Sequence, residues 1–385
     1  MHTIPLDYET LRLIWWLLLG VLLIGFALMD GYDLGVGALL PFAAKTDDER
    51  RILINLVGPT WEGNQVWLIL GGGAIFAAWP PLYAASFSGF YLAMIAILLA
   101  LILRPVGFKF RGKVHDPRWR EAWDWALFIG GFVPALIFGV AVGNLFLGVP
   151  HGFDPTLRPI YEGGFFLKFV GLLRPFALLA GLVSLTMLAA HGAAMITLRC
   201  QGAVVERARL FGAAAAAAAL VLFAIGGGWI ALMDGYVYAS VVDPAGPSNP
   251  LGKTVELHAG AWLGNFAAHP WMIAAPVIAA AGLLLALLGF AARRGWTTLA
   301  GTSLGVAGII ATAGLSLFPF LMPSNLDPSQ SLTVWDASSS QLTLFVMLLA
   351  TAIFLPLILG YTAWVFRVMR GTVTPASIDR NPNAY

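Results

Sequence analysis

Charged residues are scarce in this sequence. Lys, Arg, Asp and Glu make up only 11% of its 385 residues, whereas a soluble domain usually carries about a quarter. Such a chain has too little charge to cover a water-exposed surface, which excludes a soluble enzyme, a disordered tail and a nucleic-acid-binding protein with a basic face. The single cysteine, Cys200, excludes an intrachain disulfide, a CxxC redox centre and a cysteine-ligated cluster.

Long apolar segments dominate instead, since 59% of the residues are hydrophobic. A membrane-spanning helix needs about 20 apolar residues. The sequence predicts nine such stretches, at about 11–42, 53–79, 82–104, 121–146, 164–194, 208–234, 270–291, 297–322 and 340–367. Uninterrupted runs of this length favour helices over the alternating strands of a membrane barrel. We therefore expect an all-α, polytopic, multi-pass integral membrane protein, with one transmembrane domain over residues 1–385.

The positive charges predict how this bundle is oriented. Of the 22 Lys and Arg residues, 17 lie in the C-terminal tail or near the loops that follow spans one, three, five and seven, and the other 5 lie on the opposite side. Loops rich in Lys and Arg stay in the cytoplasm. This distribution predicts an N-terminus outside the cell and a cytoplasmic C-terminus.

Three carboxylates lie inside predicted spans, where an ionisable group is costly and typical of function. Asp30 and Asp33 are three residues apart and so share one helix face, near the cytoplasmic end of the first span. Glu62 would lie roughly 14 Å deep in a helix that starts at residue 53, with the polar residues Asn64 and Gln65 close by. One interpretation is a proton path from the cytoplasm through Asp30 and Asp33 to Glu62. The alternative is that the aspartates cap a helix or pair with basic loop residues, while Glu62 hydrogen-bonds a neighbouring helix.

The histidines give little indication of a haem or metal site. Only His191 of the six lies within a predicted span, and no His-x-x-x-His or Glu-x-x-His pair occurs. We therefore expect no metal site and no axial haem ligand in this chain, and a packing or interfacial role for His191. Trp61 has two open interpretations: it packs in the core, or it lines a partner or quinone surface.

Several distinctive motifs occur in order along the chain. They are residues 29–37 (MDGYDLGVG), 58–67 (GPTWEGNQVW), 87–91 (FSGFY), 104–108 (RPVGF), 123–125 (WDW), 318–320 (FPF) and 331–343 (SLTVWDASSSQLT). Together they strongly resemble subunit II of cytochrome bd quinol oxidases, and the likeness runs from about residue 8 to the C-terminus. In many relatives an Asp follows the tryptophan of the second motif, whereas this chain has Glu62.

The resemblance implies a function. In that family the complex oxidises membrane quinol and reduces oxygen to water in the bacterial cytoplasmic (inner) membrane. Subunit I carries two b-type haems and one d-type haem, whereas subunit II ligates none of them. Small single-helix subunits accompany the pair, and some members hold a structural quinone. A proton path from the cytoplasm passes through the positions that match Asp30 and Glu62.

Two other functions are compatible with buried carboxylates in a nine-helix bundle. One is a proton-coupled secondary transporter, which would have discontinuous helices in matching halves and would transport by itself. The other is a structural membrane scaffold, in which the carboxylates serve only packing. A d-type haem band in the visible spectrum of the co-purified complex would favour the oxidase over both.

Overall fold

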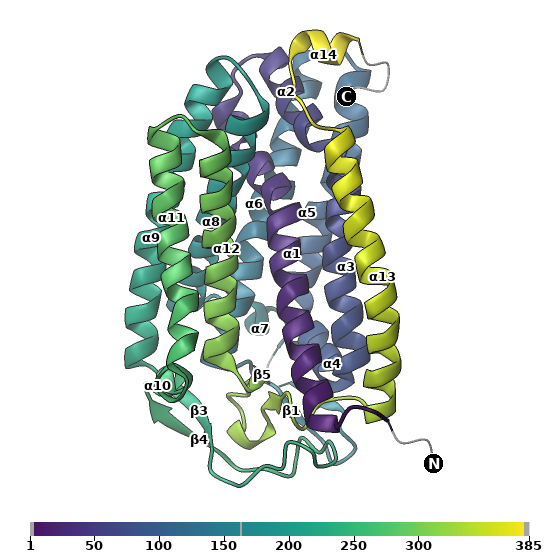
Figure 1. Ribbon diagram of the computed structural model, residues 1–385, viewed down its shortest axis with the longest axis vertical. Coiled ribbons are helices and arrows are strands. Elements are labelled where there is room, and N and C mark those ends of the chain that lie inside the picture. Colours follow the sequence, from purple (N-terminus) through teal and green to yellow (C-terminus); the bar gives the residue numbers. More distant parts are fainter. Residues whose placement is uncertain (1–3, 162–163, 381–384) are drawn as a thin grey trace.

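The protein is described here from a computed structural model, which covers residues 4–161, 164–380 and 385. It is an elongated bundle of roughly parallel helices with short hairpins at one end (Figure 1). The helices are α1 (Tyr8–Ala43), α2 (Asp47–Val57), α3 (Trp61–Ala78), α4 (Pro80–Gly89), α5 (Tyr91–Phe110), α6 (Pro117–Leu147), α7 (Phe165–Gly171), α8 (Pro175–Arg199), α9 (Ala203–Leu232), α10 (Gly264–Ala268), α11 (Ala274–Ala291), α12 (Gly295–Leu317), α13 (Gln341–Val368) and α14 (Pro375–Asp379).

Within the described residues, eight helical segments are long and apolar enough to cross a membrane. They are Tyr8–Ala43, Tyr91–Lys113, Pro117–Leu147, Pro175–Arg199, Ala203–Leu232, Pro270–Ala291, Gly295–Leu317 and Gln341–Val368. This confirms the prediction of a polytopic helical membrane protein.

The predicted stretch 53–79 is divided between two helices. Helix α2 ends at Val57 and α3 begins at Trp61, with a turn at Gly58–Thr60 between them. The first turn of α3 is rich in polar residues, so its 18 residues are less apolar than the eight segments above. Helix α3 nevertheless lies between α1 and α13 and contacts both (Figure 1).

Helix α1 lies inside the bundle because its glycines allow neighbouring backbones to come very close. A Cβ atom on Gly35 would collide with the carbonyl of Leu188 in α8, and one on Gly192 would collide with Gly35. On α6, a Cβ atom on Gly131 would collide with the backbone of Leu34. Small residues serve such close contacts between membrane helices. Helix α1 is thereby fixed against α6 and α8, and its polar residues cannot turn toward lipid.

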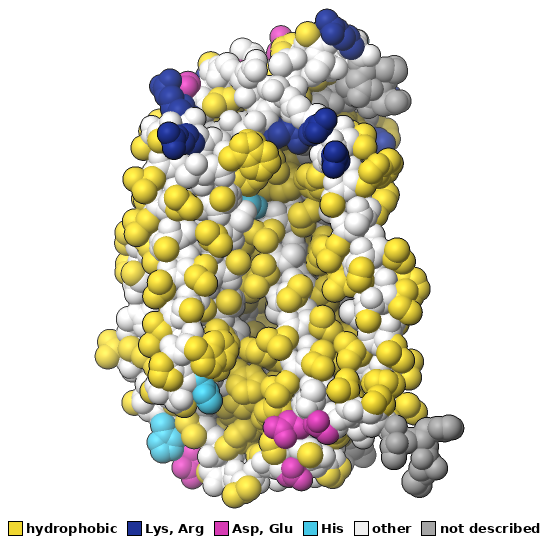
Figure 2. Space-filling model, in the orientation of Figure 1, with side chains coloured by type: hydrophobic (Ala, Val, Ile, Leu, Met, Phe, Trp, Pro, Cys, Tyr) yellow, Lys and Arg dark blue, Asp and Glu magenta, His cyan; other side chains and the backbone are white. Residues whose placement is uncertain are grey.

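The two ends of the bundle differ in charge and structure. Lys and Arg side chains gather at the end that carries α2 and α14, as Figure 2 shows for one face. The other end carries three antiparallel two-stranded sheets, which the all-α prediction did not include. Their strands are β1 (Gly152–Phe153) with β2 (Pro159–Ile160), β3 (Asp234–Tyr238) with β4 (Val255–Ala259), and β5 (Phe320–Met322) with β6 (Leu332–Thr333).

Buried ionic contacts fasten the hairpin end to the bundle. The Lys253 Nζ atom lies 2.9 Å from the Asp336 Oδ2 atom, and both side chains are buried. Arg12, at the start of α1, is completely buried and donates from Nε to the Ser338 hydroxyl at 2.7 Å and from Nη2 to the Ser248 hydroxyl at 3.0 Å. These two cations, which the sequence placed on the outer side, therefore hold the loops that follow α9 and α12 against α1.

Candidate functional site: a buried carboxylate–arginine cluster

Asp30 of α1 forms a bidentate ion pair with Arg104 of α5. The Arg104 Nη1 atom donates to Asp30 Oδ2 at 3.0 Å, and Nη2 donates to Oδ1 at 2.7 Å. The two side chains are 0% and 3% exposed, respectively. Gly130 of α6 makes room for the arginine, because a Cβ atom there would lie 2.9 Å from Arg104 Cγ. Bidentate arginine–carboxylate pairs of this kind fix geometry as well as charge.

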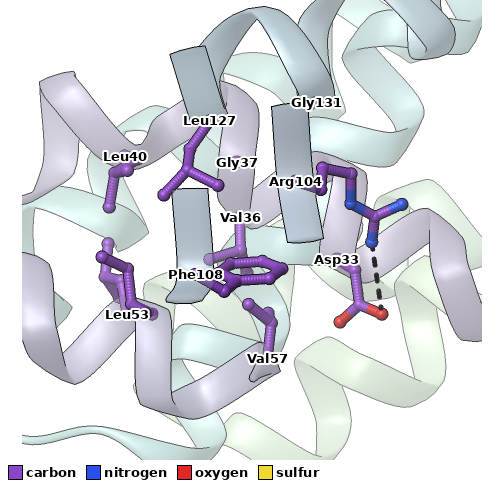
Figure 3. Close-up of a pocket in the computed structure, with 11 residues that line it drawn as sticks. Asp33, Val36, Gly37, Leu40, Leu53, Val57, Arg104, Phe108, Leu127 and Gly131 are labelled. Carbon is purple, nitrogen blue, oxygen red and sulfur yellow. Dashed lines mark ion pairs between the residues drawn. The ribbon is translucent and has the colours of Figure 1, made fainter. Parts of the chain in front are cut away.

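Asp33 lies one helical turn further along α1, on the same side as Asp30. Its Oδ2 atom accepts a hydrogen bond from Asn64 Nδ2 at 2.8 Å and lies 3.8 Å from Arg104 Nη2. Figure 3 shows the Arg104 and Asp33 side chains pointing toward one another. Asp33 Oδ1 is buried and has no hydrogen-bond partner among the residues that the structure describes. Because Arg104 alone lies beside both carboxylates and forms its bidentate pair with Asp30, the negative charge of Asp33 is less well compensated than that of Asp30.

Hydroxyl and amide groups continue the cluster toward the α2–α3 turn. The Tyr32 hydroxyl and the Thr60 hydroxyl lie 2.8 Å apart. Asn64 Nδ2, which binds Asp33, also donates to the Tyr32 hydroxyl at 2.8 Å. The break before α3 makes this possible, because it brings Thr60 and the first turn of α3 against α1.

Trp61 packs within the same cluster. Its ring is buried, with the Arg104 guanidinium 5.8 Å from the ring centroid and the Phe108 ring centroid 5.6 Å away. An arginine at this distance over tryptophan is a favourable cation–π contact. This agrees with the core-packing interpretation of Trp61.

Glu62 points away from the aspartates, and Gln65, which is half-buried, has no hydrogen bond to them among the described residues. Glu62 is exposed on the outer side of α3, in line with Val66, Ile69 and Phe76, and the described part of the chain offers it no hydrogen bond or ion pair. The depth of about 14 Å expected for Glu62 assumed one helix from residue 53; it does not hold, because α3 starts at Trp61. The structure thus brings Asp30, Asp33 and Asn64 together, but not Glu62.

The sequence does not predict that Arg104 and Arg111 are buried. The count of basic residues places Arg104 beside a loop, but Arg104 follows an apolar run and α5 continues past it to Phe110. Arg111 donates to Asp124 at 2.5 and 3.1 Å, and Arg50 donates to the same carboxylate at 2.8 Å. This second ion-pair network ties α2, α5 and α6 together at the Lys- and Arg-rich end.

His191 has the packing role predicted for it. Its Nδ1 atom lies 2.9 Å from the Thr302 hydroxyl and its Nε2 atom lies 3.0 Å from the Leu28 carbonyl. Both ring nitrogens are therefore in hydrogen-bond contact within the chain. Within residues 4–161, 164–380 and 385, no three His, Cys, Asp or Glu side chains are grouped so as to hold a metal ion.

Two cavities flank the cluster. The smaller, of about 20 Å³, is lined by Asp33, Arg104 and the apolar side chains of Val57, Phe108 and Leu127 (Figure 3). A volume of this size holds about one water molecule, and such waters satisfy buried polar atoms. The larger cavity, of about 180 Å³, reaches Tyr32 and Thr60 from the other side.

Known proteins share this sequence and fold. Cytochrome bd-I ubiquinol oxidase subunit 2 of Escherichia coli (strain K12) is 50% identical over 380 residues, which are 98% of this chain and 99% of that protein. Cytochrome bd ubiquinol oxidase subunit 2 of Bacillus subtilis (strain 168) is 32% identical over 364 residues, covering 94% and 96%. A chain in the structure of bd oxidase from Geobacillus thermodenitrificans superposes with a TM-score of 0.66 at 16% identity, over 93% of this chain and 98% of that chain.

The fold and the cluster define a polytopic helical membrane protein with ionisable groups buried between its spans. The model of the family cytochrome bd terminal oxidase subunit II matches residues 11–369. The chain belongs to this family, which confirms the resemblance seen in its motifs. It is therefore one subunit of an oxidoreductase complex of the bacterial inner membrane, a complex that contains haem and a subunit I.

Proposed function

We propose that this chain supports a haem-bearing subunit I in a quinol oxidase and supplies part of the proton path for oxygen reduction. The complex oxidises membrane quinol and reduces oxygen to water, with protons drawn from the cytoplasm. The observation that carries the proposal is the buried pair Asp30 and Asp33, which shares one arginine and leaves Asp33 Oδ1 without a partner among the described atoms. A buried ionisable group beside a cavity that can hold about one water molecule is suited to taking up and passing on a proton.

The orientation follows from the charges and from the course of the chain. Helix α1 starts at the hairpin end and α14 lies at the opposite, Lys- and Arg-rich end (Figures 1 and 2). The described ends of the chain lie at opposite ends of the bundle, which favours an odd number of crossings and supports α3 as a ninth span beside the eight apolar segments. The positive end then faces the cytoplasm, and the Asp30–Asp33 cluster lies toward that side of the membrane.

Glu62 belongs to the proposed path through its position on the outer face of α3. A carboxylate among Val66, Ile69 and Phe76 would be costly against lipid. It is better accommodated against a partner subunit, where polar groups or water can meet it. Protons would then pass from the Asp30–Asp33 cluster across α3 to Glu62 and into subunit I. Trp61, Asn64 and Gln65 would support this step by filling and polarising the space around α3.

The haems are assigned to subunit I. His191, in α8, makes hydrogen bonds with both ring nitrogens, so the chemistry of its donors does not fit a haem held by this chain. We assign the two b-type haems and the d-type haem to subunit I, as the resemblance to the family implies. Small single-helix subunits and a structural quinone complete the proposed complex.

Oxygen consumption per haem in the purified complex tests the proposed path. Glu62→Gln keeps the size of the side chain but removes its titratable proton, so turnover should fall at least about tenfold, which corresponds to about 1.4 kcal/mol of barrier. Glu62→Asp keeps the carboxyl group and should retain much more activity. Asp30→Asn should lower turnover more mildly than Glu62→Gln.

The matched control is Glu256→Gln, because Glu256 is an exposed carboxylate on β4 at the opposite end of the bundle. Its turnover should equal that of the wild type. Full activity of Glu62→Gln at normal haem content would remove Glu62 from the path. A packing role for Glu62 predicts a different pattern, with Gln tolerated and Asp lowering the yield of complex.

A further inference from the structure

The larger cavity leads from the Lys- and Arg-rich surface inward to Tyr32. It lies between α1, the α2–α3 turn, α8, the end of α13 and the segment around α14. Its lining changes along this direction, from the exposed Pro59, Met369 and Ser377 to the buried Tyr32 and Thr60. At about 180 Å³ it has room for several water molecules.

The lining offers polar partners to such water. Asn55, Arg199 and Ser377 line the cavity toward the surface, and the hydroxyl-bearing residues Thr60 and Tyr32 line its buried end. Water in a cavity persists when it finds two to four polar partners. The cavity therefore has the volume and the polar partners to hold water as far as Thr60 and Tyr32.

Beyond Tyr32 the next acceptor is Asp33. The Tyr32 hydroxyl oxygen and Asp33 Oδ2 both accept a hydrogen bond from Asn64 Nδ2, each at 2.8 Å. Two acceptors on one amide nitrogen lie no more than about 6 Å apart, a gap that one bridging water closes. Asp33 Oδ1 is still without a hydrogen bond from any described residue.

We infer that Tyr32 is a proton-relay residue that connects the cytoplasmic cavity to Asp33, with Thr60 as the hydroxyl before it. This inference rests on the proposed function. A hydroxyl group both accepts and donates a hydrogen bond. Protonated cavity water gives a proton to the Thr60 oxygen, and the original Thr60 proton moves to the Tyr32 oxygen. The original phenolic proton then moves through the bridging water to the Asp33 carboxylate, so both hydroxyls end the step neutral. Asn64 does not carry the proton but holds donor and acceptor together.

The ring of Tyr32 has a separate, structural role. It is 3% exposed and makes edge contacts with His191 and Phe366, each at 6.4 Å between ring centroids. Replacing Tyr32 by phenylalanine keeps these contacts and removes only the oxygen atom. The relay role can therefore be tested apart from the packing role.

The test uses the complete complex, purified with its haem-bearing subunit and supplied with quinol and oxygen in H₂O and in D₂O. Tyr32→Phe should lower oxygen consumption per haem at least about threefold and increase the ratio of the rates in H₂O and D₂O, with normal haem content. Thr60→Val, of equal size, should do the same to a smaller degree. Because the two hydroxyls act in series, the double variant should be no slower than Tyr32→Phe.

Tyr238→Phe is the matched control, since the Tyr238 hydroxyl is also buried but lies in β3 at the hairpin end. It should leave both the turnover and the isotope ratio unchanged. If Tyr32→Phe and Thr60→Val keep the wild-type turnover and isotope ratio while the Asp33→Asn complex is impaired, the relay is overturned. The path through the carboxylates is then retained. Wild-type turnover in Asp33→Asn as well would overturn the proposed function.

Discussion

Removal of the Arg104 charge should strongly destabilise the complex. Arg104 is the only cation that hydrogen-bonds Asp30 among the described residues, and it also lies 3.8 Å from Asp33. The side chains of this trio are at most 3% exposed, so solvent does not screen the charges that remain. Loss of one partner from a buried ion pair typically costs about 3–5 kcal/mol, because the other charge is left uncompensated.

The expected cost of Arg104→Gln is therefore about 3–5 kcal/mol. At roughly 2 °C per kcal/mol for a large chain, the temperature at which the complex loses its native haem spectrum should fall by about 6–10 °C. The exposed pair of Arg293 with Glu206 provides the control. Arg293→Gln should cost no more than about 1 kcal/mol, as for surface ion pairs.

A double-mutant cycle separates the ion pair from lost packing. Asp30→Asn removes the carboxylate that Arg104 neutralises, so the double variant with Arg104→Gln should be more stable than the sum of the single effects implies. Residues in direct contact show coupling of about 0.5–3 kcal/mol, and a bidentate buried pair belongs at the upper end. Additive effects of the two substitutions, or an Arg104→Gln complex as stable as the wild type, would show that the buried ion pair does not contribute the expected stability.

Three further predictions follow from the fold and the hairpin end. The folded chain without subunit I should bind no haem, and stoichiometric haem on the isolated chain would contradict this. A reporter fused after Tyr385 should be active in the cytoplasm and one in the loop near Lys253 only outside; the reverse pattern would overturn the nine-span orientation. Burial lowers the pKa of His151 from 6.5 to about 4, so the unfolded chain binds a proton that the folded chain excludes. Stability should therefore fall by about 3 kcal/mol as the pH drops from about 6.5 to about 4, and the hairpin end should become protease-sensitive in wild type but not in His151→Gln.

The sequence predicted a polytopic helical membrane protein correctly because apolar length is a local property. The run of residues 11–42 became α1, and the family motifs predicted the function that the comparisons confirm. The prediction of one helix over 53–79 was wrong, because this stretch contains Gly58 and Pro59. Proline disfavours a helical conformation of the residue before it. Their presence in an apolar run is the signal that could have predicted the break and the position of Glu62 in a first turn.

The partner of Asp30 could not be predicted from local patterns. Counting basic residues by side treats each one as a loop charge, so Arg104 was placed at the surface. Its burial depends on how α1, α5 and α6 pack, and in particular on Gly130, which leaves space for the arginine chain. The Tyr32–Thr60 contact likewise depends on the turn that precedes α3. Such contacts between distant segments leave no periodic trace in the sequence.

In the proposed function, protons for oxygen reduction pass through the buried carboxylates of this chain. The most direct test is the reaction of the fully reduced complex with oxygen, with proton uptake followed by a pH-indicator dye and normalised to haem. In Asp33→Asn the uptake should slow at least about tenfold, while reduction of the haems by quinol keeps its wild-type rate. Proton uptake at the wild-type rate in Asp33→Asn, in a complex with full haem content, would contradict the account.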